Sequence, residues 1–394
     1  MLYVSGIEDD KYHITDTEDD TEEVIDKKRL LEVLNLGIII QGVSVYNKRV
    51  SINVYNPESI LASLNLLGVS DMFEIEMKRG LITLNDYNGV ESSVAIPNGV
   101  SYMSDLCFSE NAFLKYVTIP NSVVEIGENC FMNCSQLQSI EIPNSVKSIR
   151  EYCFAGCISL QYIKLPNFIK KLEKACFMKC TRLKSVDIPS TVKSLGESCF
   201  YFCKSLCTIS LPNSIESIGA GCFRDCRNLV SISLFESVTF LGSLAFKSCE
   251  RLKCISIPSS VTSIGNQCFE CCESLETVKL FCRVKELGIG LFKCCRSLRH
   301  INIPDSVFSL RTSCFEGCSS LRNIVVPNSV QVIDDYCFVG CAMLDSIEIP
   351  ESVTKLGKDC FRGCSRLRYI KLSYHFKDSV SKLGLPSDCE VVYY

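Results

Sequence analysis

The sequence predicts an α/β repeat solenoid with one parallel sheet of about twelve short strands, preceded by a small α+β unit. Two observations support this. A phenylalanine recurs every 23 residues, and the apolar positions around it keep the same register in every repeat. Each coil is too small to bury its own apolar face, so stacked coils must share one core. The recurring residues are Phe108, Phe131, Phe154, Phe177, Phe200, Phe223, Phe246, Phe269, Phe292, Phe315, Phe338 and Phe361.

A short strand is predicted eight to eleven residues after each phenylalanine. Residues 139–142, Ser-Ile-Glu-Ile, alternate polar and apolar side chains, which indicates a strand with one buried face. Pro143 then ends the strand, because proline cannot donate a hydrogen bond to a neighbouring strand. Ser or Asn after the proline favours a turn.

The segment around each phenylalanine predicts a short helical turn that faces the core. In one repeat Ile149, Cys153, Phe154, Cys157 and Leu160 follow one another at three- and four-residue steps. This spacing is typical of one face of a helix. Each coil is therefore expected to contain one strand and one helical turn.

Composition and the extent of the repeat divide the chain into four predicted segments. Residues 1–93 hold 8 Lys and Arg against 17 Asp and Glu and no cysteine, whereas the remainder has a net charge of +5 and all 27 cysteines. We expect residues 1–23 to be an acidic, mobile segment, residues 24–93 a small α+β N-terminal domain or cap, residues 94–372 the twelve repeats, and residues 373–394 a C-terminal cap that ends in a strand. Within 24–93, helices are predicted over 26–36 and 57–67, and hairpins over 38–55 and 73–84.

The repeat also carries a family resemblance. The pattern Ile-Pro-x-Ser-Val-x-x-Ile-Gly-x-x-Cys-Phe-x-x-Cys-x-x-Leu-x-x-Ile stands nearly intact at residues 142–163 and 257–278. It resembles the leucine-rich repeats of the BspA-like family over residues 94–372. The resemblance implies a right-handed, leucine-rich-repeat-like array that binds other macromolecules, and several members are regarded as surface antigens or adhesins. The cysteine before the phenylalanine is often alanine in that family.

Cysteine forms two columns of the repeat. It precedes the phenylalanine in ten units, with Ala245 and Leu291 as exceptions, and follows it by three residues in eleven, with Asn111 as the exception. We interpret these cysteines as small buried core residues, since Ala and Leu replace them. Two alternatives remain: disulfides between coils whose Cα atoms lie roughly 5 Å apart, and metal binding, for which the spacing is not typical. No metal ligand and no cofactor is predicted.

Few residues are candidates for catalysis, and we expect the protein not to be an enzyme. The motifs of phosphate-binding loops, nucleophile elbows and zinc hydrolases are not present in the sequence. His300 follows Cys295 closely, but this cysteine belongs to a core column and the histidine is expected to point outward. Asp334 and Asp335 stand at a glycine position of the repeat and are interpreted as a solvated turn.

The outward positions of the strands vary between repeats, as a binding face requires, while the buried positions keep their chemistry. A middle of small hydroxyl residues with charged margins is suited to a peptide or an extended segment. The alternative is a merely soluble sheet face filled with Ser and Thr. The predicted partner-binding residues are Tyr162, Lys164, Asp187, Thr208, Ser210, Ser231, Ser233, Ser256, Lys279 and His300.

We therefore predict a non-catalytic interaction scaffold for a protein partner. The basic residues are too scattered for a nucleic-acid partner; their densest patch, Lys293, Arg296, Arg299 and Arg322, is interpreted as a solvated rim, with an acidic partner as the alternative. No apolar run approaches a membrane span, and the N-terminal residues lack standard signal-peptide features, so a cytoplasmic location is expected. The alternative is a cell-surface or secreted adhesin or antigen, exported without a standard signal peptide, that binds a host or matrix protein.

Overall fold

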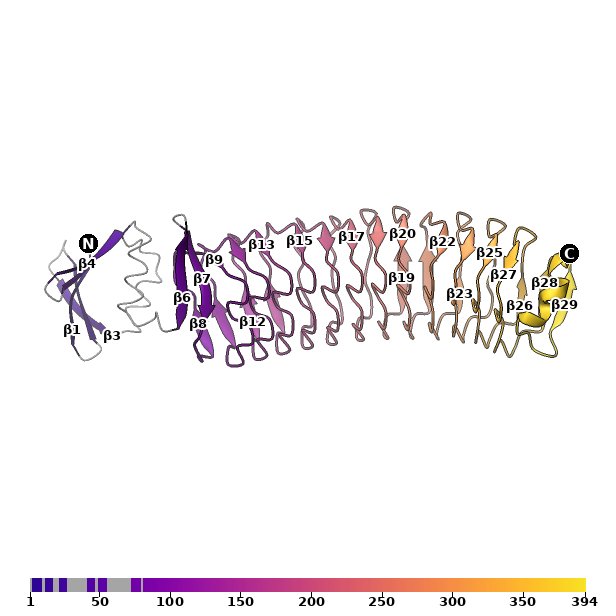
Figure 1. Cartoon of the computed structure of the whole chain (residues 1–394), viewed down its shortest axis with the longest axis horizontal. Coiled ribbons are helices and arrows are strands. Elements are labelled where there is room, and N and C mark those ends of the chain that lie inside the picture. Colours follow the sequence, from indigo (N-terminus) through magenta and orange to yellow (C-terminus); the bar gives the residue numbers. More distant parts are fainter. Residues whose placement is uncertain are drawn as a thin grey trace. The chain divides into compact units, whose positions relative to one another are not determined.

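The computed structural model shows the coils as β-solenoid turns joined by parallel strands (Figure 1). It describes residues 2–8, 11–16, 21–26, 41–46, 49–54, 72–78 and 81–394. The chain divides into two compact units, Met1–Cys153 and Phe154–Tyr394. Stacked 23-residue coils with parallel strands occur in both units, so the predicted repeat solenoid is confirmed. The helices predicted over 26–36 and 57–67 lie outside the described residues.

The first unit begins with an antiparallel five-stranded sheet of order β3-β2-β1-β5-β4. β1, β2 and part of β3 lie within residues 1–23, and β3 crosses the predicted boundary at 23/24. The mobility expected for this acidic segment stays a prediction. The strands alternate apolar and polar residues, as in Tyr12-His13-Ile14, a pattern that a count of charges does not register. The bounds are β1 Leu2–Glu8, β2 Lys11–Asp16, β3 Thr21–Asp26, β4 Gln41–Tyr46 and β5 Arg49–Val54.

A second hairpin, β6 (Phe73–Lys78) and β7 (Leu81–Tyr87), closes the edge of the first coils. β7 pairs in parallel with β9 (Val100–Met103), and β6 pairs antiparallel on its other side. Tyr87 lies between Phe73 and Phe108. Its ring is tilted against that of Phe73 and stacked on that of Phe108, with ring centroids 5.1 and 4.9 Å apart. The hairpin therefore extends the aromatic core and caps it. The boundary at 93/94 stays a prediction.

The predicted strand follows each phenylalanine and forms what we call the strand row. In the first unit it comprises β8 (Ser93–Ala95), β10 (Tyr116–Thr118) and β12 (Ser139–Glu141). In the second unit its strands are β14 Tyr162–Lys164, β19 Cys254–Ile257, β21 Thr277–Leu280, β23 His300–Ile301, β26 Ser346–Glu348 and β28 Tyr369–Leu372. Single bridges continue the row, such as those from Asp187 to Ser210 and from Thr208 to Ser231.

The sequence did not predict a second row of strands, which apart from β9 are each two residues long. A strand of two residues is too short to show an alternating pattern, so only the structure reveals it. In the first unit this row continues from β9 through β11 (Glu125–Ile126) to β13 (Ser148–Ile149). In the second unit it comprises β15 Lys171–Leu172, β16 Ser194–Leu195, β17 Ser217–Ile218, β18 Phe240–Leu241, β20 Ser263–Ile264, β22 Glu286–Leu287, β24 Ser309–Leu310, β25 Val332–Ile333 and β27 Lys355–Leu356.

Glycine commonly follows this second row because the preceding coil comes very close. A Cβ atom on Gly242 would lie 2.4 Å from the backbone nitrogen of Ala220, and one on Gly265 would lie 2.1 Å from that of Ser243. Real Cβ atoms do not approach backbone so closely, so a larger residue here requires the backbone to shift. The repeated Ile-Gly and Leu-Gly dipeptides thus have a steric cause.

The predicted helical turn around each phenylalanine is instead a pair of tight turns, and among the described residues the only helix is η1 (Tyr374–Lys382), a 3₁₀ helix. In all twelve repeats the residues two before and two after the phenylalanine have positive φ, for example 54° at Ser198 and 63° at Phe202. An α-helix cannot contain such residues. The turns still bring every third or fourth side chain inward, which reproduces the helical spacing.

Hydrogen bonds from coil to coil hold these turns in place. The amides of Ser198, Phe200 and Phe202 donate to the carbonyls of Ala220, Cys222 and Arg224 in the next coil, each at 2.8 Å. The phenylalanine rings stack below them, and consecutive ring centroids in the second unit lie 5.4–5.7 Å apart. All twelve rings are buried.

The C-terminal residues replace the coil that would follow Phe361. The amides of Asp359 and Phe361 donate to the carbonyls of Lys382 and Leu383, at 2.7 and 2.9 Å. Phe376 in η1 is buried, and β29 (Glu390–Tyr393) pairs in parallel with β28. A terminal strand thus lies where the sequence predicts one.

Candidate partner-binding face

All ten predicted partner-binding residues lie on the strand row of the second unit, and all are exposed. They alternate with buried aliphatic residues: Ile209 separates Thr208 from Ser210, and Ile232 separates Ser231 from Ser233. The side chains of a strand point to opposite faces in turn. The alternation read from the sequence therefore places these side chains on the solvent side.

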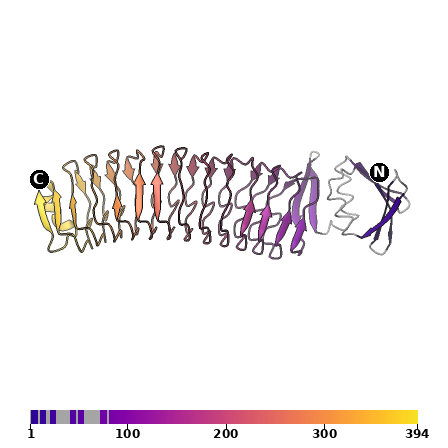
Figure 2. The same ribbon diagram turned by 180° about the vertical axis from the view of Figure 1, so that it is seen from behind.

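The parallel register brings several of these residues side by side. Asp187 is bridged to Ser210, and Thr208 to Ser231. Further along, Ser256 pairs with Lys279 between β19 and β21, and Thr277 pairs with His300 between β21 and β23. The strands of this row run parallel in Figure 2. Neighbours in a sheet have Cβ atoms about 5 Å apart, so one bound segment can touch several coils.

Three ionisable side chains of this face have no ion pair. Asp187, Lys279 and His300 have no ion-pair partner among the described residues. On other faces some charges are paired between coils, as Lys193 is with Glu216 at 2.8 Å. Asp187, Lys279 and His300 are therefore exposed polar side chains that no salt bridge engages.

The basic patch identified in the sequence is partly neutralised. Lys293 pairs with Glu316 at 2.9 Å, and Arg296 lies 3.7 Å from Glu273. Surface pairs of this kind contribute little to stability, typically under about 1 kcal/mol, but they reduce the local positive charge. The patch therefore carries less net positive charge to attract an acidic partner than its sequence indicates.

The 21 cysteines of the two core columns are buried, and their interpretation as core residues is confirmed. Thiols in the column three residues after the phenylalanine also form hydrogen bonds to backbone carbonyls. For example, Sγ of Cys203 donates to the carbonyl of Phe177 at 3.1 Å, and Sγ of Cys249 donates to that of Phe223 at 3.2 Å. Burial raises the pKa of these thiols, which keeps them protonated and unreactive.

His300 and Cys295 do not form a catalytic pair. His300 is exposed at the start of β23, whereas Cys295 is fully buried in its column. Burial raises the pKa of the Cys295 thiol well above its ordinary value. A nucleophilic cysteine needs the opposite shift and solvent access.

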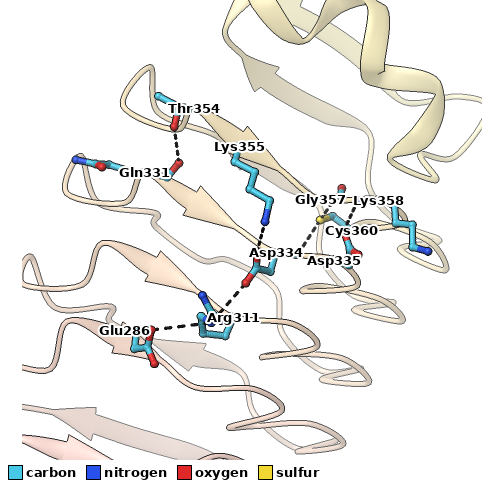
Figure 3. Close-up of polar contacts among 10 residues, drawn as sticks. All are labelled: Glu286, Arg311, Gln331, Asp334, Asp335, Thr354, Lys355, Gly357, Lys358 and Cys360. Carbon is cyan, nitrogen blue, oxygen red and sulfur yellow. Dashed lines mark hydrogen bonds and ion pairs between the residues drawn. The ribbon is translucent and has the colours of Figure 1, made fainter.

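Asp334 and Asp335 are not the solvated turn that the sequence suggested. Figure 3 shows the Asp334 carboxylate between Lys355, at 2.8 Å, and Arg311, at 3.5 Å. Asp334 is only 8% exposed, and Arg311 in turn lies 3.9 Å from Glu286. Asp335 accepts a hydrogen bond from the amide of Lys358. Ion pairs among Glu286, Arg311, Asp334 and Lys355 link four coils, so these charges stabilise the stack of coils.

Val325 is a surface feature that the sequence analysis did not select. It lies on the strand row, bridged to Asn302, and is 77% exposed. Other strand-row positions of its column carry polar side chains such as Ser210 and Lys279, so an aliphatic residue here breaks the pattern. That break is the signal which could have identified it.

The described residues contain no group of three or more His, Cys, Asp and Glu arranged to hold a metal ion. Within the same part of the chain, no helix has both the length and the apolar character that crossing a membrane requires.

Comparison with known proteins gives consistent results. The family model described as BspA type Leucine rich repeat region (6 copies) matches residues 86–207, 193–322 and 285–383. A leucine-rich repeat protein from Bacteroides ovatus is 26% identical, with 82% of this chain and 98% of that chain covered and a TM-score of 0.59. A leucine rich cell surface protein from Faecalibacterium prausnitzii is 26% identical over 80% and 97%, with a TM-score of 0.55. A leucine-rich repeat protein from Eubacterium ventriosum, at 22% identity, 75% and 94% coverage and a TM-score of 0.51, has the same fold. No curated protein matches the chain.

Proposed function

Since the chain belongs to the BspA-type leucine-rich repeat family, we propose that it is a non-catalytic scaffold that binds a protein partner on the strand row of its second unit. The observation that carries the proposal is the charge on this face. Asp187, Lys279 and His300 are exposed and lack ion-pair partners among the described residues, whereas Lys193 and Lys293, which lie off this face, are paired with Glu216 and Glu316.

The chemistry of the face favours an extended segment of a protein. Ser210, Ser233 and Ser256 are small and exposed, so a bound chain can lie flat against them. Their hydroxyls offer both donors and acceptors. Because backbone groups inside a sheet are engaged with neighbouring strands, recognition would use side chains rather than the addition of another strand.

Two locations are compatible with this activity. We propose the cytoplasm first, because the buried cysteine columns suit a reducing compartment. The alternative is the cell surface, where a host or matrix protein would be the partner. The Faecalibacterium prausnitzii protein, which is described as a cell surface protein and is 26% identical, supports that alternative.

Site-directed photo-crosslinking in the native source tests the binding face. A photoreactive residue at Ser210 or Ser233 is expected to form a defined protein adduct, whereas one at Ser365, which is exposed on another part of its coil, is not. Asp187→Lys combined with Lys279→Glu should remove the adduct, because it reverses both unpaired charges. Lys193→Glu is the matched control, since Lys193 is exposed but paired with Glu216.

Adducts that form equally at Ser365, or that survive the double charge reversal, would contradict the binding face. Treatment of intact cells with a protease separates the two locations. A protein that resists digestion lies inside the cell, and one that is cleaved lies on its surface.

A further inference from the structure

Two cysteines outside the core columns stand at the same position of consecutive coils. Cys271 and Cys294 each follow a phenylalanine by two residues, and both have a φ of 60°. Both are partly exposed, unlike the buried cysteines of the columns. The other exposed cysteines, Cys207 and Cys254, occupy different positions of the repeat and do not form such a pair.

Backbone hydrogen bonds fix the coils close together at this position. The amide of Cys271 donates to the carbonyl of Lys293 at 2.7 Å, and the amide of Cys294 donates to that of Glu316 at 2.6 Å. The stacked rings of Phe269 and Phe292 in the same two coils lie 5.7 Å apart. The distance between the two cysteines along the stack of coils is therefore fixed by these hydrogen bonds and stacked rings.

The following coil shows how closely a side chain in this column approaches the neighbouring coil. Gly317 occupies the next equivalent position, and a Cβ built on it would lie 3.5 Å from Cα and 3.3 Å from Sγ of Cys294. The same register relates Cys294 to Cys271. A disulfide needs two cysteines on closely apposed backbones. A cysteine side chain in this column reaches the adjacent coil, and the thiol of Cys271 lies within hydrogen-bonding reach of Cys294.

The two thiols also interact with each other. Burial, followed by the neighbouring charge and hydrogen bond of Cys294, raises the pKa of Cys271 to about 11, with Glu270 raising it and Lys247 lowering it. Lys247 and Glu270 form an ion pair at 2.6 Å, so their opposite effects largely cancel. Cys271 is therefore a thiol in neutral solution, and its oxidation is faster in mildly alkaline solution.

We propose that Cys271 and Cys294 form a reversible disulfide that links two consecutive coils. One thiol loses its proton, and the thiolate attacks a small disulfide such as oxidised glutathione, which releases one small thiol. The second cysteine, also as a thiolate, then attacks the mixed disulfide and releases the second small thiol. The protein loses two electrons and two protons, and the small disulfide is reduced to two thiols.

Oxidation of the folded, full-length protein tests this inference. The starting variant carries Cys207→Ser, Cys254→Ser and Cys389→Ser, which removes the other accessible thiols. After equilibration with oxidised glutathione at mildly alkaline pH, acid quenching and digestion, peptides with Cys271 and Cys294 should be joined. The intact protein should weigh two hydrogen atoms less, and dithiothreitol should restore its mass.

Cys271→Ser and Cys294→Ser, made singly in that background, provide the controls. Serine fits this column, because Ser248 occupies the same position one coil earlier, also with positive φ. Each variant should gain a glutathionyl group on its remaining cysteine and should form no link. The proposal is overturned if the starting variant takes glutathione on either cysteine without a link, if it does not react, or if a link persists in either single variant.

Discussion

Two residues of every repeat adopt a left-handed backbone conformation, and eighteen of these twenty-four positions are not glycine. A side chain in this conformation costs roughly 1–2 kcal/mol. At Lys179, φ is 62°, and the amide donates to the carbonyl of Tyr201 in the next coil at 2.7 Å. The hydrogen bonds between coils thus stabilise a conformation that the residue itself disfavours.

Lys179→Gly is therefore expected to stabilise the protein. Glycine adopts positive φ without the steric cost, and Lys179 is exposed, so little packing is lost. The free energy of unfolding should rise by about 1 kcal/mol, measured by urea denaturation. Lys184→Gly is the control: Lys184 is also exposed but has no positive φ, and glycine there should lower the free energy by about 0.5–1 kcal/mol. Equal effects of the two changes would show that strain is not the cause.

At the scale of the element, the sequence analysis located the strands and the core but assigned the wrong conformation around the phenylalanines. Cys153, Phe154 and Cys157 point inward at helical spacing because two consecutive tight turns also return the chain every three or four residues. The residues that could have revealed these turns, Tyr152 and Gly156, carry positive φ. A tyrosine does not indicate a turn in the sequence, because non-glycine residues rarely adopt positive φ.

The exposure of the candidate binding face could be predicted because alternation in a strand fixes which side chains face solvent. The sequence analysis did not identify which charges remain free, because ion pairs such as Lys193 with Glu216 join residues 23 positions apart. Such pairs become neighbours only once the coils stack in register. A search for opposite charges at the repeat distance would have found this pair, and also Lys293 with Glu316.

Removing one of the stacked phenylalanine rings should lower the free energy of unfolding more than any other single change to an element. Phe246 is buried between Phe223 and Phe269, with both centroid separations at 5.4 Å. Phe246→Ala should lower the free energy of unfolding by about 3–5 kcal/mol, because it leaves a cavity in a packed core. Phe281 is 61% exposed, so Phe281→Ala should change it by less than about 0.5 kcal/mol. A small effect at Phe246, measured in the same urea titration, would show that the core relaxes around the missing ring.

At the scale of the whole molecule, the two ends of the array are closed by different means. The hairpin β6–β7 covers one edge with an antiparallel strand and continues the aromatic stack through Tyr87. At the other edge, residues 374–394 supply the carbonyls and the strand that a further coil would have supplied. Open sheet edges pair with other chains unless they are protected, so both closures also serve solubility.

Deletion of residues 374–394 should therefore cause association rather than complete unfolding. The deletion leaves β28 as an open edge and uncovers Leu372 and Phe361, which are buried in the intact chain. Sedimentation velocity should show dimers or larger species that increase with concentration, while circular dichroism retains its strand signal. A deletion variant that stays monomeric would show that the last coil needs no cap.

The constant 23-residue step has a consequence for how such a protein changes over generations. Every coil offers its neighbours the same amides, the same carbonyls and the same ring. Recombination between two repeats of one gene removes or adds whole coils, and any multiple of 23 residues rejoins matching surfaces. The length of the strand row can thus vary by single coils while both closures stay intact. Selection can then change the length of the strand row independently of the exposed side chains that determine what it binds.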